Sequence, residues 1–268
     1  MKTMHLFAGA GGGLLGDLIL GHEPIIAVEW DRYACQVLRE RAADGWFPGL
    51  QVWEGDVRLF DPSEYAGKVD CIHAGFPCQD ISVAGKQAGV GEETRSGLYR
   101  EVLRIARVVR PKYLFLENVA AIVTNGLGTV LGDLAALGYD SEWLCLRASD
   151  CGANHHRDRW WLLAHSTDNR RNRWCGYEPW NGQDSIERGC QVLADSISKR
   201  GCSWEAWRQN AIDVRESSRC EKYWFWDIEP NVGRVANGIP NRVHRLKALG
   251  NAQVPLQAAV AWKLLGGP

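Results

Sequence analysis

Residues 4–29, MHLFAGAGGGLLGDLILGHEPIIAVE, join two short apolar runs through a glycine-rich turn. The runs Met4 to Phe7 and Ile25 to Glu29 are bounded by turn residues, which is typical of buried strands. Glu29 follows Gly9 by twenty positions. Glycines let the backbone approach a ligand, and an acidic group ending a second strand can accept hydrogen bonds from ribose hydroxyls. The stretch predicts an adenosine site, with a simple tight turn as the alternative.

The same alternation of strand and helix patterns continues to residue 164. It predicts strands at Val69–Ala74, Tyr113–Glu117 and Trp160–Ala164, and helices at Asp31–Ala43, Gly97–Val109 and Leu127–Leu137. Repeated strand–helix–strand order favours an α/β fold, with a Rossmann-like, mostly parallel sheet and helices on both faces.

The length and composition of the chain limit which kinds of domain it can contain. The chain has 268 residues, 46% of them hydrophobic, with 31 basic and 32 acidic side chains, which excludes a disordered or coiled-coil protein. We expect an α/β domain over 1–164 and a small module over 165–230, where periodicity is weak and six tryptophans occur. Residues 231–268 contain a basic stretch, Arg234 to Lys247, and an apolar helix, Val254 to Leu265, that returns to the core.

The cysteine pattern and the hydropathy of the chain indicate in which cellular compartment we expect the protein. Nine cysteines without a Cys-x-x-Cys pair argue against both a disulfide framework and a zinc site, so we expect no metal and a reducing cytoplasm. Asp17 and several glycines interrupt the first apolar stretch, which therefore reads as a strand and not as a signal peptide. Without a run of 18 apolar residues, no membrane span is expected.

A reactive centre is predicted where the strand Val69–Ala74 runs into Gly75-Phe-Pro-Cys-Gln. Cys78 follows the carboxyl end of a buried strand, where open sheets bind their ligands, and Pro77 fixes its approach. A buried structural cysteine is the alternative. The glycine-rich segment that follows, with Lys86 and Arg95, is typical of a lid.

Charged groups are expected at the same edge of the sheet. Hydrophobic neighbours would raise the pKa of Glu117 and let it donate a proton, although it could instead cap a helix from Val119 onward. Arg157 and Arg159 alternate at a strand entrance, ready for a phosphate or a carbonyl oxygen, or simply solvated. Asp56, after a short strand, is placed to accept from an adenine amino group.

These residues resemble the ordered motifs of the DNA cytosine-5 methyltransferases, over residues 1–165 and 235–265. The matching elements are Phe7-Ala-Gly-x-Gly-Gly, Glu29, Gly55-Asp56, Gly75-Phe-Pro-Cys-Gln, Arg95-Ser-Gly-Leu, Glu117-Asn-Val, Arg157-x-Arg159 and Gly250-Asn-Ala-x-Val. The resemblance implies methyl transfer from S-adenosylmethionine to carbon 5 of a flipped-out cytosine in a specific sequence of double-stranded DNA. It also implies a cytoplasmic monomer that has a cognate restriction endonuclease as a possible partner.

The resemblance also implies residue roles. Cys78 would be the nucleophile and Glu117 the proton donor to ring nitrogen 3, with Arg157 and Arg159 completing the catalytic set. The implied cofactor-binding residues are Phe7, Gly9, Gly11, Glu29, Trp30, Asp56, Pro77, Leu98 and Asn251. The expected DNA-binding residues are Gln79, Ser82, Lys86, Arg95, Arg242 and Arg245, while the module over 165–230 would select the sequence.

One departure and three alternatives stay open. Asn154-His155 stands where the family has Pro-Gln before the arginine pair, and we read His155 and His156 as a replacement and not as a metal or proton-relay pair. A catalytically silent DNA-binding regulator would not need Cys78 and Glu117. A transfer RNA methyltransferase would usually carry a Cys-Phe-Thr element, which is absent. A nucleotide-dependent oxidoreductase with a reactive thiol leaves the Glu-Asn pattern unexplained.

Overall fold

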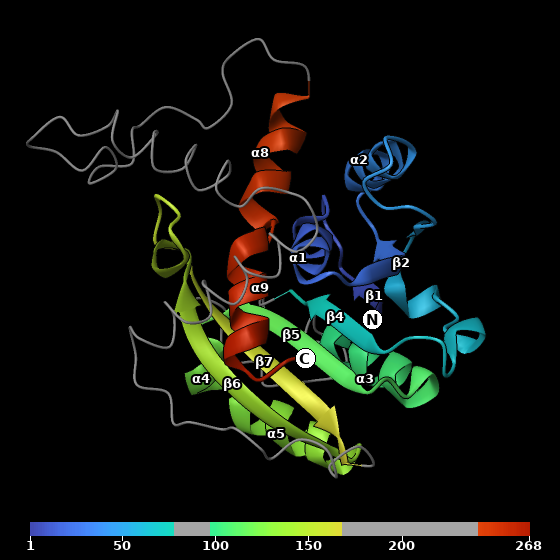
Figure 1. Cartoon of the computed structure of the whole chain (residues 1–268). Coiled ribbons are helices and arrows are strands. Elements are labelled where there is room, and N and C mark those ends of the chain that lie inside the picture. Colours follow the sequence, from blue (N-terminus) through green and yellow to red (C-terminus); the bar gives the residue numbers. More distant parts are fainter. Residues whose placement is uncertain (78–96, 168–240) are drawn as a thin grey trace, which may run out of the picture.

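The computed structural model describes residues 1–77, 97–167 and 241–268. Its centre is a β-sheet with helices around it (Figure 1), and this sheet has seven strands. The strand order is β3-β2-β1-β4-β5-β7-β6. The strands are β1 (Lys2–Leu6), β2 (Glu23–Glu29), β3 (Gln51–Glu54), β4 (Cys71–Gly75), β5 (Tyr113–Val119), β6 (Tyr139–Arg147) and β7 (Asp158–Ser166).

The sheet is parallel from β3 to β5, and β7 then pairs antiparallel with both β5 and β6. The carboxyl ends of β1, β2, β4 and β5 therefore meet at one edge. The register places Gly75 of β4 beside Glu117 of β5, and Glu117 beside Trp161 of β7. This edge is where an open parallel sheet binds its ligands.

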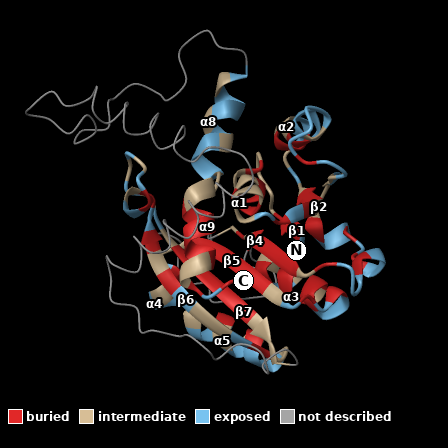
Figure 2. Ribbon diagram, viewed as in Figure 1, coloured by how far each residue is buried: buried red, intermediate tan, exposed pale blue. Residues whose placement is uncertain are grey.

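Helices cover both faces of the sheet, and buried residues concentrate in the strands between them (Figure 2). One face packs against α3 (Gly97–Val109), α4 (Ile122–Asn125) and α5 (Leu127–Ala136). The other carries α1 (Gly12–Leu20) and α9 (Pro255–Leu264), and α2 (Arg32–Ala43) packs on this side through Leu38. α8 (Arg242–Asn251) has no buried residue.

Glycines in α1 allow the C-terminal segment to pack closely against this helix. A Cβ atom at Gly16 would lie 3.0 Å from the Pro255 carbonyl oxygen and 3.1 Å from the Ala258 Cβ. One at Gly12 would lie only 2.2 Å from the carbonyl oxygen of Gln253. These glycines cost helix propensity, but they let residues 253–258 lie directly against the beginning of the chain.

The structure confirms the α/β fold with a mostly parallel sheet and helices on both faces. All predicted strands and helices are present: α3 has the predicted bounds, the others have at least one shifted end, and α9 occupies the predicted apolar helix. The sequence patterns did not predict α1, β6 or α8 as elements. The module predicted over 165–230 lies, from residue 168 onward, outside the described residues. None of the described helices combines the length and apolar character needed to cross a bilayer.

Candidate active site at the carboxyl edge of the sheet

The glycine-rich turn after β1 is held against the end of β2 by Glu29. The amide of Gly9 donates to Oε2 of Glu29 at 2.7 Å, and the amides of Trp30 and Asp31 donate to Oε1 at 2.9 and 2.8 Å. Phe7 has a φ of 57°, a left-handed conformation that is rare for a bulky residue. The carboxylate and the strained turn thus fix one another at the predicted nucleoside site.

Two further groups flank Glu29 at this edge. The Trp30 side chain is 71% exposed, so its ring is available for stacking. Asp56 follows β3 and begins a short 3₁₀ turn, where its Oδ1 accepts the Arg58 amide at 3.1 Å. The edge therefore presents a carboxylate, an exposed indole and a second carboxylate from β2 and β3, which together suit a sugar and an adenine ring.

Glu117 occupies the middle of the edge, near the end of β5. Its Oε1 lies 2.9 Å from Nε of Arg159, and its Oε2 accepts from Nε2 of Gln253 at 3.4 Å. Burial raises the pKa of Glu117, and the nearby Arg159 opposes this only in part. The predicted pKa direction is confirmed, and the helix-cap alternative is wrong, because α4 begins at Ile122 without a side-chain cap.

The arginine pair has two separate roles. Arg157, with a φ of 35°, donates from Nη1 to the Gly250 carbonyl at 3.0 Å and from Nη2 to the Ala252 carbonyl. Arg159 turns to the carboxylate of Glu117. Both of these acceptors of Arg157 are backbone carbonyls of the C-terminal segment and not groups of a ligand. Arg157 holds that segment, and Arg159 faces the acid.

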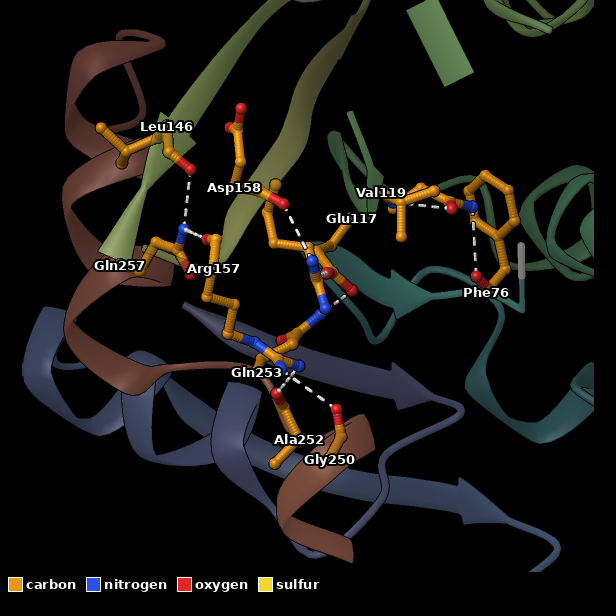
Figure 3. A network of polar contacts seen from close by, with 12 residues as sticks. Phe76, Glu117, Val119, Leu146, Arg157, Asp158, Gly250, Ala252, Gln253 and Gln257 are labelled. Atoms are coloured by element: carbon orange, nitrogen blue, oxygen red, sulfur yellow. Dashed lines mark hydrogen bonds and ion pairs between the residues drawn. The ribbon is translucent and has the colours of Figure 1, made fainter. Parts of the chain in front are cut away.

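The C-terminal segment completes the network drawn in Figure 3. The buried Gln257 donates from Nε2 to the carbonyls of Leu146, at 2.7 Å, and of Arg157, at 3.0 Å. A Cβ atom at Gly75 would lie 2.8 Å from Nε2 of Gln253 and 2.9 Å from Oε2 of Glu117. Only glycine at the end of β4 allows these two side chains to approach each other without displacement.

The chain leading to Cys78 is anchored beside Glu117. Asn118 donates from Nδ2 to the Phe76 carbonyl at 3.1 Å and accepts the Val119 amide at 2.8 Å (Figure 3). The described chain ends there at Pro77, so Cys78 lies outside it, as do Gln79, Ser82, Lys86 and Arg95. The last residues before the predicted nucleophile are thus fixed to the strand that carries Glu117.

A cavity of about 30 Å³ connects the glycine-rich turn with Glu117. Its walls include residues 5–9, Gly75, Glu117 and residues 251–253. A larger hollow of about 440 Å³ lies beside β3, lined by Gln51, Trp53 and Tyr65 among others, and none of the predicted site residues contributes to it. The small cavity therefore marks the candidate site, because the glycine-rich turn and Glu117 both line it.

The remaining predicted residues that the structure describes lie partly in this cavity and partly outside it. Asn251 lines it, Leu98 packs partly buried against the core in the first turn of α3, and Arg242 and Arg245 lie on α8. Sequence reasoning missed Gln253, which is the variable position of Gly250-Asn-Ala-x-Val. It also gave no role to Gln257, whose buried amide has no signature in the apolar run around it.

Comparisons with known proteins agree with this geometry. A family model for C-5 cytosine-specific DNA methylases matches residues 1–201. The Type II methyltransferase M.NgoMIV of Neisseria gonorrhoeae is 32% identical over 221 residues, which cover 79% of this chain and 66% of that protein. The Type II methyltransferase M.HhaI of Haemophilus parahaemolyticus is 32% identical over 172 residues, which cover 63% and 50% respectively.

A solved structure shares the fold. The S. pombe Dnmt2 methyltransferase superposes with a TM-score of 0.53 over 70% of this chain and 55% of that one, at 15% identity. This likeness concerns architecture alone. The chain spans about half the length of several of the curated relatives that it matches.

Proposed function

The chain belongs to the C-5 cytosine-specific DNA methylase family, and on this basis we propose that it methylates carbon 5 of cytosine within a specific sequence of double-stranded DNA. Members of the family take the methyl group from S-adenosylmethionine. The observation that carries the proposal is the buried Glu117, paired with Arg159 on a cavity that also opens onto the glycine-rich turn.

The residues at the edge of β2 and β3 fit S-adenosylmethionine. Glu29 uses its two oxygens for three backbone amides, but a carboxylate has about four acceptor positions, so capacity for a ribose hydroxyl remains. The exposed ring of Trp30 would stack on adenine, and Asp56 would accept from its amino group. When bound, the cofactor supplies an electrophilic methyl group.

Side chains of this chain would carry out the remaining steps of the reaction. Carbon 5 of cytosine is a poor nucleophile, so the Cys78 thiolate would add to carbon 6 while Glu117 protonates ring nitrogen 3. Arg159 would face the carbonyl oxygen of the base. Carbon 5 would then be able to accept the methyl group, and a base would remove the carbon 5 proton. Elimination of the thiolate, with return of the ring-nitrogen proton to Glu117, would restore the ring and free the enzyme.

A raised pKa suits Glu117 to this task. A carboxyl group whose pKa is raised keeps its proton to a higher pH than usual, which favours proton donation. Nε of Arg159 contacts one oxygen of Glu117, and Gln253 contacts the other. Both contacts come from elements other than β5, so the acid has a defined orientation.

The target base must leave the duplex to reach this buried centre. We assign Arg242 and Arg245 of α8 to phosphate contacts and residues 165–230 to base recognition. α8 is joined to the cofactor edge by Lys247, whose Nζ lies 2.6 Å from Oδ2 of Asp31.

We also propose that the enzyme is a monomer in the cytoplasm of a bacterium or phage-infected cell, with a restriction endonuclease of the same specificity as its partner.

The decisive experiment traps the covalent step. Methylation mapping in cells that express the protein first identifies the target sequence. A duplex with 5-fluorocytosine at that position should then form a stable adduct with the wild-type protein and none with C78A, because fluorine cannot be eliminated as a proton. C78A should still bind cofactor and DNA.

The alternatives predict other outcomes. A silent regulator would bind DNA without leaving a methylated cytosine, and a transfer RNA enzyme would methylate RNA but not the duplex. An adduct that forms equally with C78A would refute the role of Cys78.

A further inference from the structure

A cluster of chemically active side chains borders the Glu117 cavity, whose walls include His5 and His73. His5 of β1 and His73 of β4 are paired in register, and Asp17 of α1 lies over them. One ligand atom from each lies within 4.8 Å of the others. The methyl-transfer chemistry proposed above uses none of these three residues.

The cluster is enclosed. Nε2 of His5 lies 2.8 Å from Oδ2 of Asp17, and Nδ1 of His73 lies 3.8 Å from Oδ1. The exposed fractions of the three side chains are 3%, 2% and 5% for His5, His73 and Asp17. Nδ1 of His22, equally buried, lies 3.5 Å from Oδ1 of the same carboxylate.

The carboxylate of Asp17 is only 5% exposed, so it has lost most of its contact with water. A carboxylate in such a place is costly unless hydrogen bonds or a cation compensate its charge.

Polar atoms in the cluster also lack hydrogen bonds. Neither ring nitrogen of His73 has a hydrogen-bond partner, and Nδ1 of His22 has none. Buried polar atoms in folded proteins are almost always bonded, so each orphan indicates an unfilled interaction. A proton could satisfy the charge of Asp17, but it would not satisfy both nitrogens of His73.

We propose that His5, Asp17 and His73 bind a zinc ion. Zinc prefers four ligands of this nitrogen and oxygen type in a tetrahedral arrangement, whereas magnesium and calcium prefer oxygen ligands alone. A two-histidine, one-carboxylate iron site needs open positions for its substrates, whereas these three side chains are at most 5% exposed. The ion is therefore structural, and it ties β1, β4 and α1 together at the wall of the cavity.

The test uses untagged full-length protein produced with zinc in the medium and dialysed against a chelator too weak to strip a structural site. Elemental analysis should find about one zinc per chain. Protein stripped with a strong chelator should regain its melting temperature when one equivalent of Zn²⁺ is added. D17N and H73Q should each lose the bound zinc and this thermal response, whereas H156Q, which alters an exposed histidine, should retain both.

Wild-type protein alone can overturn the proposal, even if the variants fail to fold. No zinc after the mild dialysis, together with an unchanged melting temperature on adding Zn²⁺, would show that a proton balances Asp17. Loading the stripped protein with Co²⁺ gives a second readout, because visible bands without a thiolate charge-transfer band indicate nitrogen and oxygen ligands. A thiolate band would assign the ion to cysteines elsewhere and refute this site.

Discussion

Replacing Glu117 by glutamine keeps the shape of the side chain and removes its titratable proton. The amide oxygen can still accept from Nε of Arg159, which lies 2.9 Å from the carboxylate. A positioned acid contributes about 10²- to 10⁴-fold. We therefore expect single-turnover methyl transfer by E117Q to slow by that factor, which corresponds to about 3 to 5 kcal/mol of transition-state stabilisation. The rate is measured by following the transfer of a tritiated methyl group to the mapped target.

The same substitution makes a prediction about stability. Because the pKa of Glu117 is raised on folding, the unfolded chain loses this proton at a lower pH than the folded protein does. The stability of the wild type should therefore fall relative to E117Q as the pH rises above 4.5, the ordinary value for this group. The slope cannot exceed about 1.4 kcal/mol per pH unit for one proton, and it should vanish above the folded-state pKa.

Urea unfolding of both proteins between pH 4.5 and pH 8 measures this difference. If the wild type instead gained stability over E117Q with rising pH, the carboxylate would be stabilised by Arg159 more than burial destabilises it, and our reading of the site would be refuted. Turnover by E117Q within a few-fold of the wild type would remove Glu117 from the proton transfer.

Three further outcomes are expected. G75A should lower stability by about 1 to 3 kcal/mol in urea unfolding, because the added methyl group overlaps Gln253 and the carboxylate; unchanged stability and turnover would mean that both side chains move freely. R242A and R245A should each lower the slope of log binding constant against log salt by about 1, without changing the methylated sequence. Exchange of residues 165–230 for those of a relative should change the methylated sequence but leave cofactor affinity, measured by calorimetry, within a few-fold.

Sequence patterns predicted the elements whose apolar residues are uninterrupted. They missed elements in which polar residues or glycines interrupt the apolar pattern. In β6, Asp140, Ser141 and Glu142 precede the alternation that buries Leu144 and Leu146, and they hide the beginning of the strand. α1 was missed because its glycines, which allow the close approach of the C-terminal segment, are typical of a loop. Local periodicity indicates neither kind of element.

Likewise, the sequence predicted some residues of the candidate site and missed others. Glu29 and Glu117 stand at strand ends in recognisable patterns, so their positions followed from the sequence. Gln253 contacts Glu117 across 136 positions, and no local pattern indicates that contact. The cluster of His5, Asp17 and His73 was equally invisible, because only the register of β1 and β4 places the two histidines together.

The hydrogen bonds from Arg157 to residues 250 and 252 also determine when the site can form during synthesis. They span 93 and 95 positions, and Gln257 reaches back 111 positions to Leu146. Contacts this distant in sequence close late, because the intervening chain must first be ordered. A ribosome-bound chain that stops short of residue 250 thus contains the acid and both arginines but not the segment that aligns them. The contacts that hold Arg157 and orient Glu117 therefore form only after residues 250–257 have been added.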